Sequence, residues 1–241
     1  MPRRRLTISE TRWPENAEFV SEAQKVMANI PALLLGYVWK GYDLLVEEVL
    51  SSIDLFGRPE DVERDLTERL EIRIRRSMTG YEPFDIRHGV AERESRQAPP
   101  AQPPEYDLAF ALRSNERIMW PLEAKVLATD GQIADYTKAV RERFLTCYYA
   151  PFSSEGSMLG YLNRGRPEDA FVRIGAELAC SLAQNNDFRN RPHKVSLHTR
   201  KVPDGKAYPS KFRCHHMILS LTSDKPSAPG SGRDPSPGCA A

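Results

Sequence analysis

Cysteine is scarce in this sequence, and its spacing excludes the usual cysteine frameworks. Only four cysteines occur in 241 residues, and no two of them form a Cys-x-x-Cys pair. We therefore expect reduced thiols and not a disulfide-stapled secreted fold. Long apolar runs are missing too, since the most apolar run, residues 30–39, is too short to span a bilayer. No secretory leader follows the basic N-terminus, so a cytoplasmic protein is the default expectation.

A surplus of charge and the common nucleotide motifs are also absent. The formal net charge is +1, so any surface for nucleic acid must be a local patch. No phosphate-binding loop and no nucleophile elbow occurs. One group of potential zinc ligands exists, Cys214-His215-His216 with His193 and His198 upstream. Its spacing differs from that of zinc fingers, and adjacent strand residues point to opposite faces, so we interpret these as structural residues.

The composition that remains is typical of a globular chain with a packed core. Hydrophobic residues make up 40% and charged residues 28%. We expect an extended lead-in over residues 1–14 and a helical segment over residues 15–57, broken near Pro31, that packs on the core. A domain over residues 58–222 follows. Residues 223–241 are rich in Pro, Ser and Gly, which predicts a disordered tail.

Hydrophobic periodicity predicts an α/β domain. Apolar residues recur every four positions from Val62 to Met78, which predicts a helix over residues 58–78. Helices are also expected over residues 131–149 and 167–183. Strands are expected over residues 84–93, 107–112, 117–126, 158–162, 194–199 and 215–221. This order indicates a mixed central sheet flanked by helices.

The strands over residues 107–112 and 117–126 form a predicted hairpin with two unlike faces. Closing it symmetrically about Asn115 pairs large apolar residues on one face: Leu112 with Ile118, Phe110 with Trp120, and Leu108 with Leu122. On the other face Asp107 lies opposite Glu123, with Cβ atoms about 4.5–5.5 Å apart, and Lys125 points to the same side. Two carboxylates this close repel unless a positive charge lies between them. Carboxylate oxygens are also the ligands that Mg²⁺ prefers.

Asp107, a turn, and then Glu123-Ala124-Lys125 on the next strand resemble the motif of the PD-(D/E)XK nuclease superfamily. The resemblance covers roughly residues 58–162 and implies a restriction-endonuclease-like core. In that superfamily the residues matching Asp107 and Glu123 ligate Mg²⁺ or Mn²⁺, and the backbone carbonyl matching Ala124 adds a ligand. The amine matching Lys125 lies beside the attacking water. The chain departs from the motif's name by lacking a proline directly before Asp107.

Two further features follow from the same resemblance. Some branches of the superfamily carry Gln-x-x-x-Tyr on the next helix, which Gln132 and Tyr136 match. Residues four apart share one helix face, so both side chains are expected to reach the site. Members often add an acidic residue from the helix before the sheet. Glu63 and Glu71 both qualify, and the sequence does not choose between them.

The resemblance implies a metal-dependent nuclease that hydrolyses nucleic acid, with DNA favoured over RNA and a homodimer left open. A role in restriction or anti-phage defence follows only by analogy. The alternative is a non-cleaving nucleic-acid-binding or assembly module of the same fold, and a third candidate is a zinc-stabilised interaction domain. The plainest alternative is a solvated hairpin face on which Glu123 and Lys125 form a surface pair.

Overall fold

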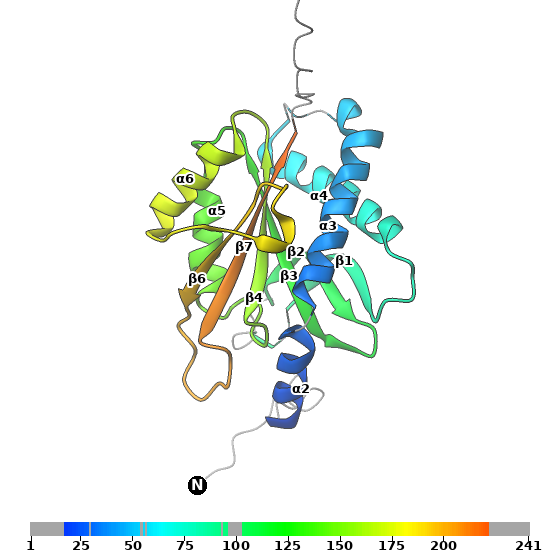
Figure 1. Cartoon of the computed structure of the whole chain (residues 1–241). Coiled ribbons are helices and arrows are strands. Elements are labelled where there is room, and N and C mark those ends of the chain that lie inside the picture. The colour runs from blue at the N-terminus through cyan, green and yellow to red at the C-terminus, as the bar shows by residue number, and fades with distance from the viewer. Residues whose placement is uncertain are drawn as a thin grey trace, which may run out of the picture.

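A mixed sheet of seven strands, in the order β1-β2-β3-β4-β7-β6-β5, runs through the computed structural model (Figure 1). The structure describes residues 17–28, 30–53, 55, 57–92, 94–95 and 103–221. The predicted lead-in and tail therefore lie outside the described residues. The strands are β1 (Phe84–Ala91), β2 (Glu105–Leu112), β3 (Asn115–Leu127), β4 (Glu155–Leu162), β5 (Ala183–Gln184), β6 (His193–Thr199) and β7 (Lys211–Ser220). The predicted α/β class with a mixed sheet is confirmed.

The direction of the strands changes in the middle of the sheet. Strands β1, β2 and β3 are antiparallel neighbours. Strand β4 then runs parallel to both β3 and β7, and β7, β6 and β5 are antiparallel again. Parallel strands need a crossover connection, and helices supply it here. The C-terminal end of β3 pairs with β4, whereas the pairing of β3 with β2 ends at Leu122.

Helices cover both faces of the sheet and enclose two hydrophobic clusters. The first cluster joins the even-numbered core residues of the β2–β3 hairpin from Leu108 to Ala124 to α2, α3 and α4. The second joins the other face to α5, η2 and α6. The helical segments are α2 (Ala17–Ala28), α3 (Pro31–Glu48), η1 (Leu50–Ser52), α4 (Pro59–Ser77), α5 (Ala134–Ala139), the π-helical η2 (Val140–Phe144), α6 (Pro167–Leu178) and η3 (Asn186–Phe188). Among the described residues, no helix combines the length and apolarity needed to cross a membrane.

Local sequence explains where the first helices begin. Pro31 opens α3 and Pro59 opens α4, positions where the missing proline N–H costs nothing. The predicted break near Pro31 is therefore confirmed. Glu60 and Asp61 lie in the first turn of α4, where they favour the positive end of the helix dipole.

The hairpin register is confirmed in its centre and wrong at its turn. Leu108 pairs with Leu122 and Phe110 with Trp120, as predicted. Leu112, however, pairs with Asn115 and not with Ile118, because the register shifts after Ala111. The turn is thus tighter than a symmetrical closure requires, and β3 takes up the extra residues as a bulge.

The helix expected over residues 131–149 is much shorter than predicted. The α-helical part covers only α5, and η2 continues it with a π-helical hydrogen bond from the Leu145 N–H to the Val140 carbonyl, 3.0 Å long. The chain then leaves helical geometry, with positive φ at Cys147 and Ala150. π-Helical turns depend on tertiary contacts and have no apolar period of their own. The two-residue strand β5 was also not predicted.

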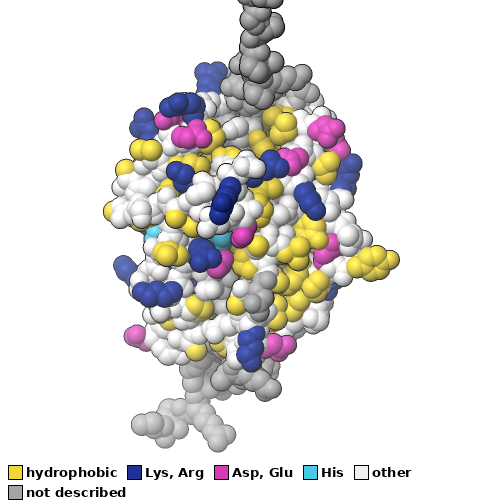
Figure 2. Space-filling view, viewed as in Figure 1, with side chains coloured by type: hydrophobic (Ala, Val, Ile, Leu, Met, Phe, Trp, Pro, Cys, Tyr) yellow, Lys and Arg dark blue, Asp and Glu magenta, His cyan; other side chains and the backbone are white. Residues whose placement is uncertain are grey.

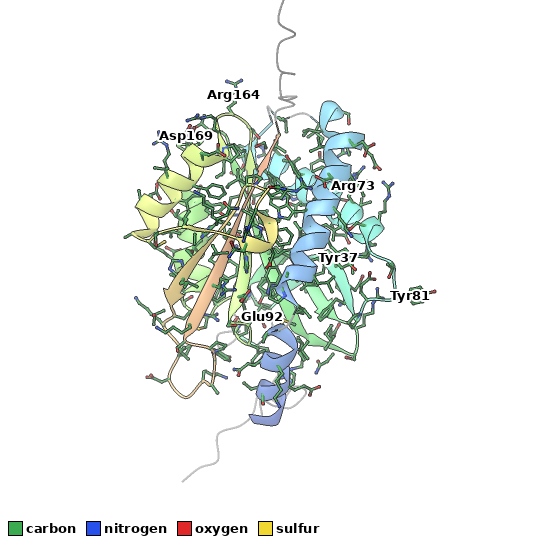
Figure 3. The ribbon with its side chains drawn as sticks, viewed as in Figure 1. Tyr37, Arg73, Tyr81, Glu92, Arg164 and Asp169 are labelled. Atoms are coloured by element: carbon green, nitrogen blue, oxygen red, sulfur yellow. The ribbon has the colours of Figure 1, made fainter. Side chains whose placement is uncertain are left out.

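Helices α3 and α4 meet at a glycine. Tyr37 on α3 donates a 2.8 Å hydrogen bond to Glu82 in the loop that follows α4, and Figure 3 labels Tyr37 on α3 and Arg73 on α4. A Cβ atom on Gly41 would lie 2.6 Å from Ile74 Cγ1 and 2.8 Å from the Ile74 backbone nitrogen. Only glycine lets the two backbones approach this closely.

We expect Gly41→Ala to lower the free energy of unfolding by about 1–3 kcal/mol, because the new methyl group overlaps the backbone of α4. Gly36 on the same helix is the matched control, since a Cβ atom added there would have nothing within 4 Å. Gly36→Ala should raise stability by about 0.5–1 kcal/mol through helix propensity. Urea unfolding measures both, and equal effects at the two positions would contradict the close approach.

Candidate functional site

The carboxylate of Asp107 replaces a backbone partner at the point where β2 and β3 stop pairing. The β2–β3 ladder reaches Leu108 and Leu122. Beyond it, the Ala124 N–H donates a 2.7 Å hydrogen bond to Asp107 Oδ2. From Leu122 onward β3 pairs with β4 on its other side. The two strands therefore part here, and the opening is filled by side chains from the motif residues.

Three carboxylates converge on the Lys125 ammonium group. Its Nζ lies 2.8 Å from Glu63 Oε1, 3.0 Å from Glu123 Oε1 and 3.8 Å from Asp107 Oδ2. It also donates to the carbonyl of Ala124. Asp107 and Glu123 therefore lie close to a shared amine, as predicted. The predicted ladder pair of Asp107 with Glu123 is not formed, because β2 and β3 stop pairing at Leu108 and Leu122.

The structure decides between the two candidate acids of α4. Glu63 reaches the site, where its Oε2 also accepts a 3.1 Å hydrogen bond from the Val126 N–H. Glu71, two turns further along α4, instead pairs with Arg75, which also binds Asp85 on β1. The sequence could not separate the two, because both lie near the apolar face of the same helix.

Arg143 and Tyr149 belong to the cluster although sequence reasoning did not select them for it. Arg143 donates to Glu123 Oε1 and, over 2.9 Å, to the Tyr149 hydroxyl. The Tyr149 hydroxyl donates in turn to the carbonyl of Glu105 at the start of β2. Arg143 lies on the unpredicted π-helical turn η2, so no helical periodicity could place it beside β3.

Burial raises the free energy of the charged groups in the cluster. The Glu123 side chain is fully buried, and its Oε2 has no hydrogen-bond partner, whereas 29% of the Asp107 side chain is exposed. Three carboxylates face two cations, so the fully ionised set carries a net charge of −1. Burial, reinforced by Asp107, raises the pKa of Glu123 to about 7 against the pull of Lys125 and Arg143. Burial alone would lower the pKa of Lys125, but the surrounding carboxylates outweigh it and raise that pKa.

The donor set fits a hard divalent cation. Two carboxylates and the Ala124 carbonyl are oxygen ligands of the kind that Mg²⁺ and Mn²⁺ take, and the bare Glu123 Oε2 is a buried acceptor without a donor. In the part of the chain that the structure describes, no three His, Cys, Asp or Glu side chains form a ready-made metal site. The Lys125 ammonium lies between the carboxylates, so a metal ion and this amine would have to share the space.

No family model, curated protein or solved structure matches the chain. The geometry of the cluster is therefore the only support for a function.

The two helix residues of the predicted site are not brought to the carboxylates together. Tyr136 on α5 is fully buried, and its hydroxyl lies 3.0 Å from His216 Nδ1. Gln132 is exposed and precedes α5, which begins at Ala134. The prediction that the two share one helix face is therefore wrong, because α5 begins two residues after Gln132. Their catalytic roles stay predictions.

The arginines of α4 are mostly committed to ion pairs. Arg69 pairs with Asp65 over 2.8 Å, and Arg76 with Glu48 over 2.6 Å. Arg75 is held by Glu71. These contacts agree with a solvated helix face and leave little support for phosphate contacts from this helix.

A buried arginine holds the segment that carries Arg143 and Tyr149. Arg200, only 4% exposed, follows β6. It donates hydrogen bonds to the backbone carbonyls of Phe144, Tyr149, Ala150 and Ser153, at 2.9, 2.6, 3.0 and 2.9 Å. The end of a helical segment leaves carbonyls without partners, and the planar guanidinium satisfies them at once.

We expect Arg200→Ala to lower the free energy of unfolding by about 3 kcal/mol, because four buried carbonyls lose the guanidinium and, among the described residues, only Phe144 and Ala150 keep a backbone N–H donor. Arg200→Lys should recover part of this loss, since an ammonium group keeps the charge but cannot match the fork geometry. Exposed Arg164 (Figure 3) is the control, and Arg164→Ala should stay within about 0.5 kcal/mol. Urea unfolding of all three variants is the measurement. If Arg200→Ala leaves the free energy of unfolding unchanged, then Arg200 does not hold this segment in place.

Proposed function

We propose that the chain is a metal-dependent nuclease of the PD-(D/E)XK kind, with a restriction-endonuclease-like core, that hydrolyses phosphodiester bonds of DNA. The observation that carries this proposal is the convergence of Asp107, Glu123 and Glu63 from three separate elements on Lys125. Packing alone does not call for three acids and an amine at one spot. Burying Glu123 costs folding free energy, and a functional site is a common reason to retain such a cost.

Each residue of the cluster has a definite task in this proposal. A bound Mg²⁺ supplies charge neutralisation for the phosphate and a more acidic water. Asp107, Glu123 and the Ala124 carbonyl would hold the ion, and Lys125 would donate to the attacking water or to the developing negative charge. Arg143, with 39% of its side chain exposed, would bind a phosphate oxygen from the opposite side.

The second candidate, a non-cleaving module of the same fold, also has support. Lys125 already neutralises part of the carboxylate charge, and no ready-made metal site is present among the described residues. A closed ion-pair cluster of this type can be purely structural. The two candidates differ in metal dependence, so one assay separates them.

The test is cleavage of plasmid DNA, single-stranded DNA and RNA with Mg²⁺, Mn²⁺ or EDTA. Wild-type protein should cleave DNA only with metal, and Asp107→Ala and Lys125→Ala should each lose about 1000-fold in rate. Lys138→Ala removes an exposed lysine of α5 and should leave the rate unchanged. Nucleic-acid binding without cleavage would favour the second candidate, and cleavage that survives both substitutions would overturn the proposal.

A further inference from the structure

A cavity lies on the face of the sheet opposite the Glu123 carboxylate. Its volume is about 460 Å³, and its lining comes from α2, α3, β4, the β5–η3 segment, β6 and β7. Glu123 is in register with Met158, and Met158 with His216, so these side chains share one face. Neighbouring strand residues alternate, which places His215 on the other face, where it lines the cavity. The cavity is thus separate from the proposed nuclease site.

A chain of four side chains fixes the protons at the base of this cavity. The indole N–H of Trp39 can only donate, and it lies 3.3 Å from His193 Nδ1. His193 is neutral, since burial and then its neighbours His215 and His216 lower its pKa to about 2. Its one proton is therefore on Nε2, which donates over 3.1 Å to His215 Nδ1.

The next hydrogen bond in the chain joins His215 to the carboxylate of Glu155. His215 accepts at Nδ1, so its proton is on Nε2, which donates over 2.9 Å to Glu155 Oε2. Arg213 lies 3.3 Å from the other oxygen of Glu155. Every donor in the chain points toward Glu155. Neither histidine keeps a free ring nitrogen toward the cavity, which argues against the zinc candidate.

Hydrogen bonds to their neighbours orient two side-chain amides at the rim. The Gln184 amide group donates to the carbonyls of Phe188 and His193, which leaves its oxygen. The Asn185 oxygen accepts a 3.0 Å hydrogen bond from the Asp187 N–H, and its NH₂ group faces the two histidines. Among the residues that the structure describes, the lining contains two carboxylates, Glu155 and Asp187, and one guanidinium group, Arg213.

The remaining wall is apolar. It consists of small and aliphatic side chains from the end of α2, the first turns of α3, and β6: Ala28, Pro31, Ala32, Leu35 and Val195. Figure 2 views this face, and histidine (cyan) is visible near its centre with acidic and basic side chains beside it. Concave sites with an apolar wall and a few converging polar groups are where small ligands bind.

We propose that this cavity binds an organic cation, a primary ammonium or guanidinium group on a short aliphatic chain. The cationic nitrogen donates to Glu155 and Asp187, and the aliphatic part lies along Pro31, Leu35 and Val195. The described lining has one more carboxylate than it has guanidinium groups, so it favours a cation over a phosphate or a carboxylate. The inference is independent of the proposed nuclease activity.

Two sources offer this chemistry, a free polyamine or the basic side chain of a protein partner. Calorimetric titration of the full chain with spermidine, with agmatine and with a short arginine- and lysine-containing peptide distinguishes them. Binding of the free amines supports a small-molecule site, and binding of the peptide alone supports a side chain from a partner. N-acetylated spermidine should bind more weakly, because acetylation removes an ammonium charge.

Variants place the ligand in the cavity. Glu155→Gln and Asp187→Asn should each weaken binding at least tenfold, whereas Asp169→Asn on α6 and Asp107→Asn at the proposed metal site should leave it unchanged. Asp187 is exposed, so its variant tests the proposal even if Glu155→Gln fails to fold. The proposal is overturned if no cation binds at millimolar concentration, if Asp187→Asn binds like the wild type, or if adenosine monophosphate binds instead.

Discussion

Replacing Glu123 with glutamine is expected to stabilise the protein at pH 8 and to abolish the proposed metal-dependent cleavage. Burial, with a further contribution from Asp107, raises the pKa of Glu123 from 4.5 to about 7. The folded chain therefore holds this proton more tightly than the unfolded chain. The stability that Glu123 contributes is fully present below pH 4.5 and is lost as the pH rises through 7, a change of about 3 kcal/mol.

Glutamine does not ionise, so the variant escapes this loss. The gain at pH 8 should be about 1–3 kcal/mol, because Lys125 and Arg143 lose an ionic partner and offset part of it. At pH 4.5 the two proteins should be equally stable. Urea unfolding across this pH range is the measurement.

Glu116 on the same strand provides the control, since 59% of its side chain is exposed. Glu116→Gln should change stability by no more than about 0.5 kcal/mol at either pH. If Glu123→Gln is less stable than the wild type at pH 8, then Lys125 and Arg143 hold Glu123 as a structural ion. That outcome would favour the non-cleaving module over the nuclease.

We expect acid to destabilise the protein, because two buried histidines take up protons more readily in the unfolded chain. Burial, and then neighbouring histidines, lower the pKa of His193 to about 2 and that of His216 to about 3. Both pKa values lie below the ordinary value of 6.5, so the unfolded chain binds these protons more tightly. The stability is present above pH 6.5 and is lost as the pH falls, by about 2.7 kcal/mol per pH unit for two sites.

The slope of stability against pH isolates this effect from other titrating groups. His216 bonds with Tyr136 and Ser196 at 3.0 and 2.7 Å, and glutamine can replace it without titrating. His216→Gln should reduce the slope between pH 6 and 5 by about 1.4 kcal/mol per unit, whatever its effect at pH 7. Exposed His88 is the control, and His88→Gln should leave the slope unchanged. An unaltered slope in His216→Gln would show that this ring already carries a proton in the folded state.

The hairpin shows which parts of the fold are readable from local pattern. Alternation along β2 and β3 placed Phe110 opposite Trp120, because a slip of one residue would move every large apolar side chain of a strand to the other face. The pattern failed at Leu112, where the register shifts. A bulge depends on how the turn closes, and that is not encoded in the alternation of side chains.

In the candidate site, too, some contacts can be predicted from the sequence and others cannot. Asp107, Glu123 and Lys125 lie within one hairpin, so their spacing in the sequence predicts their meeting in space. Glu63 comes from another element, and its choice over Glu71 depends on how α4 crosses the end of β3. Glu63 reaches the Lys125 amine and the Val126 N–H, whereas Glu71 lies two turns away beside Arg75.

The sequence by itself determined the α/β class, the break before α3, and the shared side of the three motif residues. These follow from short-range rules, the period of two in strands and the missing N–H of proline. Tertiary structure alone decided that Arg143 and Tyr149 join the carboxylates, because a π-helical turn and the carbonyl contacts of Arg200 bend the chain toward them. It also decided the proton positions from Trp39 to Glu155. Such contacts join residues far apart in the chain, and their free energy arises only when packing has removed water from between them.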